Sequence, residues 1–362
     1  MGAKSKLISK FKTNRRFLQH RKMILQPQFL AVCSALTEAL NTIPDSVKML
    51  AKQHNPWFES ENITAAAEAW SDALQAENLS EWLKDHVVAE HPKKIAIIMA
   101  GNIPLVGLHD VLSVMVSGHI ALCKLSSDDT ILMNYCIDAM NTVLENKILR
   151  IERVKEVDAV IATGSNNSAK IFETYFHKLP HLIRRNRTAV AVLSGHETKQ
   201  ELHSLGSDIF SYFGLGCRNI SKVFVPAGYD FTSFFEAIFP YGNIVNHHKY
   251  ANNYDYNKAI YLMGSEKFLD NNFLMIRRDE KSLHSPLSVV FYDFYNSEAE
   301  IEQTLTLLQE EIQCVASTMN LNFPRRVELG KTQGPKLWDY ADGIDTLKFL
   351  KSLQFEASTV SQ

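Results

Sequence analysis

Long hydrophobic runs are missing from this sequence of 362 residues. The longest apolar runs, such as residues 95–100, are far shorter than the ~20 residues that span a bilayer, so no membrane-spanning segment is expected. An excess of one charge is missing too, because 38 Lys and Arg stand against 40 Asp and Glu. A nearly neutral chain has no global attraction for nucleic acid or for an anionic membrane. Neither partner is therefore predicted.

Paired cysteines are also absent, since the five cysteines form no CxxC motif and are odd in number. No leader with a continuous apolar core opens the chain. We expect reduced thiols and a cytoplasmic protein.

Eight Lys and Arg surround apolar side chains within residues 4–22, which a helix on a membrane surface or on an acidic partner would explain. A solvated helix face is the simpler interpretation and is preferred.

The spacing of apolar residues predicts an α/β fold behind a helical N-terminal region. Residues 23–90 have helical spacing, and from residue 93 strands alternate with helices. Such alternation gives a parallel sheet that binds ligands at the carboxyl ends of its strands. The turns that follow Met99, Lys124 and Thr163 are therefore expected to line one cleft.

A second α/β block begins near His196 and contains residues 242–257, GNIVNHHKYANNYDYN, which we interpret as a long loop. Three regions are predicted: N-terminal helices with a cofactor domain at 1–195, a catalytic domain at 196–330, and a segment at 331–362. We expect that last segment to return to the cofactor domain or to make an oligomer contact. The sequence has no repeat of fixed period and no low-complexity linker, which favours two closely packed blocks.

One cysteine differs from the other four in its setting. Cys217, in FGLGCRNISKVFVP, follows Gly214 and Gly216 and precedes Arg218, whose charge favours a thiolate. We interpret it as a nucleophile. Asn102, in the turn AGNIP, offers a side-chain amide that would stabilise an oxyanion, although an Asn in a turn is more often a local cap. The remaining cysteines stand in apolar runs and are interpreted as small buried hydrophobes: Cys33, Cys123, Cys136 and Cys314.

Three segments resemble the aldehyde dehydrogenase superfamily. They are MAGNIPLVGLHDVLSVMVSGHIALCKLSSDD, VDAVIATGSNNSAKIFE and FGLGCRNISKVFVP. Together with the C-terminal KTQGPKLWDYADGIDTLKFL, they are most similar to the LuxC-like acyl-CoA reductases of the bioluminescence type. This resemblance covers the chain from about residue 90 onward. It implies an aldehyde dehydrogenase-like fold with a Rossmann-type cofactor domain and an α/β catalytic domain.

The resemblance implies a role for individual residues. Cys217 matches the nucleophile, Asn102 the oxyanion-stabilising asparagine and Lys124 the lysine at the adenosine ribose. Gly164 and Ser165 match the turn at the cofactor pyrophosphate, although GSNNS taken alone is an ordinary connection.

The run KLSS, residues 124–127, resembles the KPSE motif of the superfamily. The final glutamate of that motif would repel a 2′-phosphate, and Ser127 stands in its place. Lys124, Ser126 and Ser127 could donate to that phosphate, which predicts NADPH rather than NADH, unless Asp128 and Asp129 turn inward toward the phosphate.

Three departures from the family pattern modify this prediction. Val192 falls where hydrolysing dehydrogenases keep a general base, so the acyl-enzyme is expected to exchange with CoA rather than with water. Ala169 replaces the last glycine of the pyrophosphate turn, and Ser282 replaces a ribose-binding glutamate. The His247–His248 pair lacks a third ligand at recognisable spacing, so no metal is predicted.

The sequence therefore predicts an acyl-CoA reductase that acts through an acyl-cysteine. Its substrate would be a fatty acyl group carried by CoA or by an acyl carrier protein. A non-catalytic partner subunit of an acyl-transferring complex and an ordinary aldehyde dehydrogenase remain the alternatives. The sequence leaves open an acyl-transferring protein partner and assembly into a homo-oligomer.

Overall fold

The computed structural model describes residues 27–144 and 148–354, which divide into two compact units. Among the described residues, one unit holds those up to 185 together with those from 344 onward, and the other holds 186–343. The basic segment 4–22 lies outside the described residues. No helix in the described ranges is long and apolar enough to cross a membrane.

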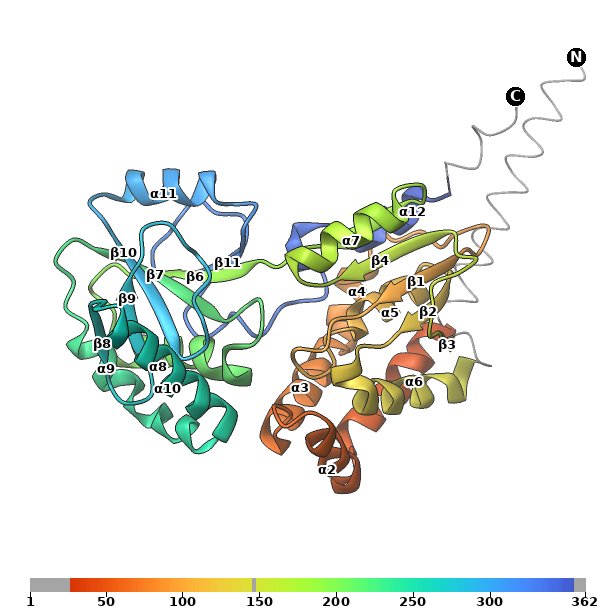
Figure 1. Ribbon diagram of the computed structural model, residues 1–362. Coiled ribbons are helices and arrows are strands. Elements are labelled where there is room, and N and C mark those ends of the chain that lie inside the picture. The colour runs from red at the N-terminus through yellow and green to blue at the C-terminus, as the bar shows by residue number, and fades with distance from the viewer. Residues whose placement is uncertain (1–26, 145–147, 355–362) are drawn as a thin grey trace, which may run out of the picture. The chain divides into compact units, whose positions relative to one another are not determined.

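The first unit is a parallel five-stranded sheet with helices before and between its strands (Figure 1). Its strand order is β3-β2-β1-β4-β5, and neighbouring strands in it are parallel. Helix 27–41 and α2 to α4 precede the sheet, as the helical spacing predicted. The elements are α2 (Asp45–His54), α3 (Ser60–Ala73), α4 (Ala76–Leu83), β1 (Lys94–Ile98), α5 (Leu108–Val116), β2 (Ile120–Lys124), η1 (Ser127–Asp129), α6 (Thr130–Leu144), β3 (Ile148–Arg150), β4 (Ala159–Thr163), α7 (Asn166–Phe176), β5 (His181–Arg184) and α12 (Thr346–Ser352).

The second unit is a seven-stranded sheet of order β12-β11-β6-β7-β10-β9-β8, in which only β8 is antiparallel to its neighbour. Alternate side chains of β6 and β7 enter two cores, one with α8 and α9 and the other with α11. Figure 1 shows α11 on one side of this sheet and α8 to α10 on the other. The elements are β6 (Thr188–Val192), α8 (Lys199–Phe210), η2 (Ser211–Gly214), β7 (Ile220–Pro226), α9 (Thr232–Ile238), η3 (Phe239–Asn246), α10 (His248–Met263), β8 (Phe268–Asp270), β9 (Met275–Arg278), β10 (Val289–Tyr295), α11 (Glu298–Leu307), β11 (Ile312–Ala316), β12 (Arg326–Val327) and η4 (Ala341–Gly343).

The boundaries of the predicted regions need correction. The first boundary lies at 185/186 rather than at 195/196, because β6 pairs with β7 and β11 of the second sheet. The C-terminal segment divides, since residues 331–343 belong to the second unit. The described residues from 344 onward return to the first unit, as expected for the end of the chain.

The interpretation of residues 242–257 as a long loop was also wrong, because α10 begins at His248. Its buried residues recur at helical spacing, but they are aromatic and polar rather than aliphatic: Tyr250, Tyr254, Asn257 and Tyr261. The hydroxyl of Tyr250 donates to the Phe273 carbonyl at 3.0 Å, which satisfies a phenol that is 2% exposed.

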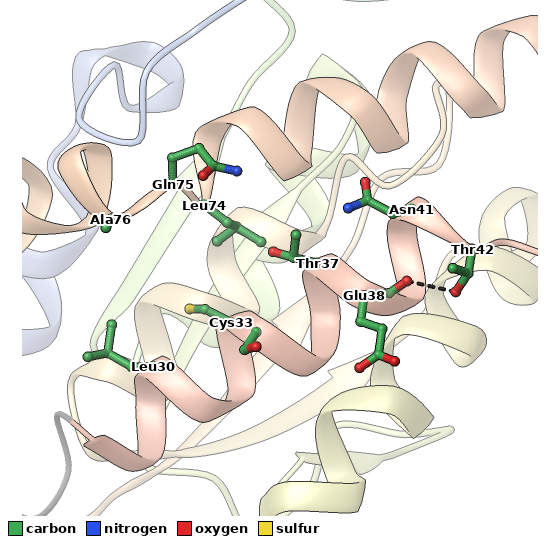
Figure 2. A pocket seen from close by; sticks show the side chains of 10 residues that line it. Leu30, Cys33, Thr37, Glu38, Asn41, Thr42, Leu74, Gln75 and Ala76 are labelled. Atoms are coloured by element: carbon green, nitrogen blue, oxygen red, sulfur yellow. Dashed lines mark hydrogen bonds between the residues drawn. The ribbon is translucent and has the colours of Figure 1, made fainter.

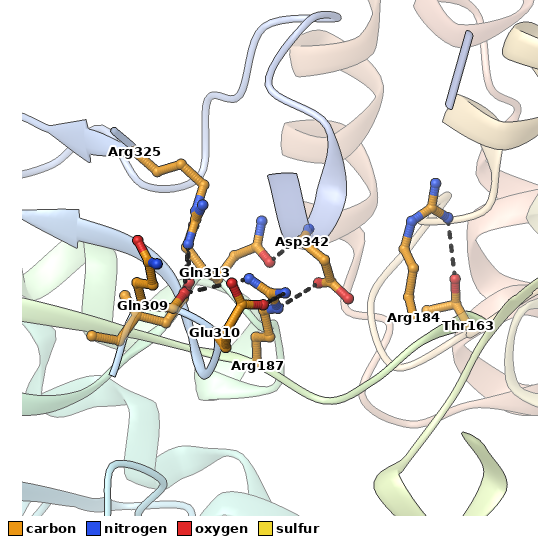
Figure 3. Close-up of polar contacts among 9 residues, drawn as sticks. Thr163, Arg184, Arg187, Gln309, Glu310, Gln313, Arg325 and Asp342 are labelled. Atoms are coloured by element: carbon orange, nitrogen blue, oxygen red, sulfur yellow. Dashed lines mark hydrogen bonds and ion pairs between the residues drawn. The ribbon is translucent and has the colours of Figure 1, made fainter. Parts of the chain in front are cut away.

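The chain passes between the two units at 185/186 and at 343/344. Polar contacts near these two points hold the chain within each unit. In the first unit, the guanidinium of Arg184 donates to both carboxylate oxygens of Asp110, at 2.6 and 2.9 Å, and to the Thr346 hydroxyl at 2.8 Å. This arrangement fixes the start of α12, and a buried carboxylate and guanidinium stabilise a fold only when paired in this way. In the second unit, Arg187 pairs with Asp342, 3.6 Å apart, as Figure 3 shows.

Candidate functional site

The first unit places three predicted turns at one edge of its sheet. Strands β1, β2 and β4 are parallel neighbours, so the turns that follow them all leave from their carboxyl ends. The chain progresses outward from β1 in one direction to β3 and in the other to β5, which makes the space between β1 and β4 a topological switch point. Open α/β sheets bind nucleotides at such points. The turns carrying Asn102 and Gly164 flank it.

The turn after β1 is packed tightly against the turn after β2. A Cβ added at Gly101 would lie only 2.6 Å from the Ser126 Oγ, so only glycine permits this approach. Asn102 follows directly and is exposed. Leu105, at the end of this turn, is buried and has a left-handed φ of 61°. A bulky residue in that region is strained and needs support from its surroundings.

The predicted cofactor residues Lys124, Ser126 and Ser127 lie together where β2 ends and η1 begins. The Ser126 hydroxyl accepts the Asp128 amide at 3.3 Å, which starts η1, while Ser127 and Asp128 are exposed. From α2, the His54 ring contacts the Ser127 carbonyl, and the Asn55 amide donates to the Asp128 carbonyl at 3.3 Å. The backbone of this turn is thus held while the Ser127 side chain faces solvent.

Gly164 and Ser165 form the turn between β4 and α7. Ser165 is the N-cap of α7, and its hydroxyl accepts the Ser168 amide at 3.2 Å. A Cβ at Gly164 would lie 2.9 Å from the Ser168 Cβ, so the turn approaches the helix closely. Ala169 is fully buried, which shows that this position accommodates a methyl group. An exposed helix N-terminus at a switch point suits a phosphate, because its amides point outward.

Cys217 lies on the second unit and differs in exposure from the other four cysteines. It is half-buried, whereas the others are buried, and all five are thiols rather than disulfides. Burial raises the pKa of Cys33, Cys123 and Cys314 to about 12 each and also raises that of Cys136. Thiols with such pKa values are inert near neutral pH, because only the thiolate is nucleophilic.

The backbone that presents Cys217 is strained. Tyr212, Phe213 and Gly214 have consecutive left-handed φ angles of 51°, 59° and 82°. Non-glycine residues in that region cost about 1–3 kcal/mol each and tend to occur at functional sites. Asn219 holds the turn from inside, because its side-chain amide donates to the carbonyls of Asp208, Ile209 and Ser211 and its Oδ1 accepts the Gly216 amide at 2.8 Å. In the sequence, only the glycine at 214 indicates this geometry.

Arg218 influences the thiol of Cys314. Its guanidinium donates to the Asp339 carbonyl at 3.0 Å. Burial raises the pKa of Cys314, and the Arg218 charge opposes this increase. The expected influence of Arg218 on a thiol is therefore found at Cys314, which sequence reasoning treated as an ordinary core residue.

The interpretation of Val192 as the place of a missing base was wrong. Val192 is fully buried at the carboxyl end of β6, where it pairs with Phe224, whereas Cys217 precedes the amino end of β7. A side chain at position 192 cannot reach the thiol. The carboxyl of Asp208, at the end of α8, accepts the amides of Gly330 and Thr332 and the Thr332 hydroxyl. The Asp208 carboxyl therefore has a structural role, because it holds residues 330–332 through these hydrogen bonds.

His247 contacts the turn that precedes Cys217. Its ring stacks on the ring of Phe213, with the centroids 4.3 Å apart, and lies 5.2 Å from the ring of His248. Within residues 27–144 and 148–354, no cluster of three or more His, Cys, Asp or Glu could hold a metal ion. The ring contact with Phe213 ties the start of α10 to the turn before Cys217.

A surface hollow of about 510 Å³ lies elsewhere, between helix 27–41 and the junction of α3 and α4 (Figure 2). Its lining residues include Cys33, Glu38 and Asn41, and none of the predicted site residues lines it. With the Cys33 thiol buried and its pKa raised, this hollow has no nucleophile.

The structure thus assembles the predicted residues in two groups. Asn102, Lys124, Ser126, Ser127, Gly164 and Ser165 occupy the carboxyl edge of the first sheet, and Cys217 occupies a strained turn of the second unit. The first unit has a sheet of the type that binds nucleotides. The second unit has a half-buried thiol, which is the candidate nucleophile.

Comparison with solved structures identifies this fold as that of the aldehyde dehydrogenases. Aldehyde dehydrogenase 21 from Physcomitrella patens, in complex with succinate, matches with a TM-score of 0.67 at 12% identity, covering 90% of this chain and 84% of that one. Glyceraldehyde-3-phosphate dehydrogenase GapN from Methanocaldococcus jannaschii, complexed with NADP, matches with 0.65 at 11%, covering 96% and 92%.

An aldehyde dehydrogenase from Bacillus cereus in complex with NAD+ matches with a TM-score of 0.58 at 12% identity, covering 81% of this chain and 72% of that one. No protein-family model and no curated protein sequence matches the chain. The predicted fold class is confirmed, and two of these neighbours are complexes with NAD+ or NADP.

Proposed function

We propose that the protein is an acyl-CoA reductase that converts an acyl-CoA thioester to an aldehyde with NADPH. The observation that carries the proposal is the half-buried Cys217 on a strained turn of an aldehyde dehydrogenase fold, with the other four cysteines buried. The LuxC-like sequence resemblance directs the proposal toward acyl-CoA rather than free aldehyde. A LuxC-like enzyme would act on a fatty acyl group carried by CoA or by an acyl carrier protein.

The chemistry assigned to Cys217 is acyl transfer. Its thiolate attacks the thioester carbonyl, Asn102 and the Cys217 amide hold the oxyanion, and the bond to the CoA sulfur breaks. CoA leaves as a thiolate and takes a proton, which leaves an acyl-cysteine. A reduced nicotinamide supplies the hydride that this acyl-cysteine accepts. Collapse of the thiohemiacetal then releases the aldehyde and restores the Cys217 thiolate.

The first unit fits the nicotinamide nucleotide on structural grounds. Lys124 and the hydroxyls of Ser126 and Ser127 lie at the carboxyl end of β2, and Ser165 begins a helix at the switch point. Phosphates are bound by lysine, by hydroxyls and by helix N-termini. We assign Lys124, Ser126 and Ser127 to the adenosine ribose and its 2′-phosphate, and Gly164 with Ser165 to the pyrophosphate.

Preference for transfer to CoA over hydrolysis rests on the LuxC-like resemblance, and the Asp208 carboxyl on α8 is already held by the amides of Gly330 and Thr332. The chain has no Asp or Glu between Glu173 and Glu197, the stretch through which it passes from the first unit to the second. Glu197 itself accepts the Ser194 amide at 2.6 Å and the Gly195 amide at 3.1 Å, which ties it to a turn. Where no base activates it, water attacks a thioester slowly and a CoA thiol competes.

An ordinary aldehyde dehydrogenase is the second candidate, because proteins of that kind are the structural neighbours.

One experiment separates the acyl-CoA reductase from the ordinary aldehyde dehydrogenase. The purified protein is given an acyl-CoA and NADPH, and cofactor oxidation and free CoA thiol are followed together, with aldehyde and NADP+ supplied in a parallel reaction. Equal amounts of oxidised cofactor and free thiol support the proposal. Acid formation from aldehyde without CoA supports the second candidate, and failure to bind either cofactor supports a non-catalytic subunit.

A further inference from the structure

The turns after β1 and β2 interlock around one buried carboxyl group. Asp129, the last residue of η1, is 2% exposed, and its Oδ2 accepts the amide of Leu105 at 2.7 Å. Leu105 is the residue with a φ of 61°, so this hydrogen bond supports the strained end of the turn that carries Asn102. Asp129 lies two residues after Ser127 on the chain that forms the predicted cofactor turn.

A second contact joins the same two turns. A Cβ at Gly101 would lie 2.6 Å from the Ser126 Oγ and 3.1 Å from the Asp129 backbone nitrogen. Gly101 and Leu105 bracket Asn102 in sequence, and both are therefore held by η1 and the residue before it. The position of Asn102 consequently depends on the position of the Ser126–Asp129 segment.

We infer that Asp129 is a positioning residue that couples the oxyanion-binding turn to the nucleotide-binding turn. It touches neither substrate nor cofactor in this account. It fixes the Leu105 amide, which sets the direction of the Asn102 side chain, and it does so from the segment that carries Ser126 and Ser127. This inference rests on the proposed function for the roles of the two turns, whereas the interlock itself is a property of the fold.

Placement of Asp129 inside the protein requires a reason, because burying an acidic side chain without an ion pair is unfavourable. Burial raises the pKa of Asp129 to about 8, while the amides of Leu105 and Met133 oppose that increase. Near neutral pH the group is therefore largely an uncharged acid, which can accept the Leu105 amide without burying a full charge. Asparagine has the same shape and can accept the same hydrogen bond, whereas alanine cannot.

The test uses Asp129→Ala, Asp129→Asn and, as a matched control, Asp158→Ala. The Asp158 carboxylate also accepts a backbone amide, that of Lys94 at 2.7 Å, but at the amino end of β1, away from the two turns. Three quantities are measured: hydrogen exchange of the peptide containing residues 100–108, the rate of Cys217 acylation by acyl-CoA, and the dissociation constant for NADPH.

We expect Asp129→Ala to speed exchange in residues 100–108, to slow acylation by on the order of 10²-fold and to weaken NADPH binding, since small displacements of reacting groups have such effects on rate. Asp129→Asn restores all three quantities, and Asp158→Ala changes none. Gly101→Ala, which separates the turns without touching the carboxyl, should reproduce the effects of Asp129→Ala and replaces it if that variant does not fold.

Unchanged exchange in both Asp129→Ala and Gly101→Ala would overturn the interlock. Faster exchange with normal acylation and normal NADPH binding would overturn the positioning role. If the wild-type protein itself forms no acyl-cysteine, the proposed function fails, and the exchange measurement still decides whether the two turns are coupled.

Discussion

The rings of Phe213 and His247 lie with their centroids 4.3 Å apart, and their planes are inclined by 32°. Phe213 is one of the left-handed residues in the turn before Cys217, and His247 precedes α10. Aromatic pairs of this kind contribute about 0.5–1.5 kcal/mol, comparable to the cost of one strained residue. The contact therefore helps to offset the strain in the turn that presents the thiol.

Replacement of His247 should show whether this ring contact matters for reactivity. We expect His247→Ala to relax the turn and to lower the rate of Cys217 acylation, whereas His247→Phe keeps a ring against Phe213 and retains the rate. Rates of acyl-CoA consumption in a single turnover measure this difference. Equal loss in both variants would instead assign the imidazole a chemical role.

Asn102→Ala tests the oxyanion assignment. Removal of one oxyanion donor lowers the rate by about 10² to 10³-fold. Because Asn102 is exposed at the tip of its turn, the melting temperature should change little. Acylation rate and thermal unfolding are measured on the same preparation. A normal rate with a large loss of stability would identify Asn102 as a structural cap of the turn.

The pH dependence of stability should report the buried carboxyl of Asp129. Its folded-state pKa is raised to about 8, chiefly by burial. A group with a raised pKa stabilises the fold fully below its unfolded pKa, and that contribution is lost as pH rises toward the folded value. Relative to wild type, Asp129→Asn should therefore gain stability progressively from about pH 4 to about pH 8 and level off above that.

Chemical denaturation across this pH range measures the difference between the two proteins. Nearby titratable groups are Asp128 in the same turn, His54 from α2 and Cys136 on α6, whose pKa is raised by burial and further by Asp129. All three are present in both proteins, so the comparison cancels their direct contributions. A difference that does not vary with pH would contradict a raised pKa at Asp129.

Ser127→Glu tests the cofactor preference. Asp129 turns into the protein and Asp128 remains exposed, so one of the two acidic side chains near the predicted 2′-phosphate is withdrawn. A glutamate at 127 would restore like-charge repulsion and shift the preference from NADPH toward NADH. The ratio of kcat/KM for the two cofactors, at one fixed acyl-CoA, measures the shift. An unchanged ratio would mean that the ribose binds elsewhere.

The sequence was sufficient to predict the alternation of strands and helices and the position of the turns that carry Asn102, Lys124 and Gly164. Those elements follow local rules, since buried parallel strands are continuous apolar runs and turns are marked by glycine and polar residues. It was also sufficient to separate Cys217 from the other cysteines, because Gly214 and Gly216 mark a turn whereas the other four lie in apolar runs.

Long-range relationships could not be predicted in the same way. β6 resembles the strands of the first sheet in composition, and only its pairing with β7 and β11 places it in the second. The buried face of α10 is made largely of tyrosines whose hydroxyls need distant partners, such as the Phe273 carbonyl. The contact of Asp129 with Leu105 joins residues 24 positions apart through backbone geometry that the sequence does not mark.

The most direct test of the central claim is the mass of the protein after incubation with acyl-CoA in the absence of any reductant. The account predicts one acyl group per chain, located on Cys217 by peptide mapping, with release of one equivalent of CoA. Cys217→Ala should form no adduct and still bind NADPH, and Cys314→Ala should be acylated like wild type. An adduct that persists in Cys217→Ala, or one located on any other cysteine, would contradict the account.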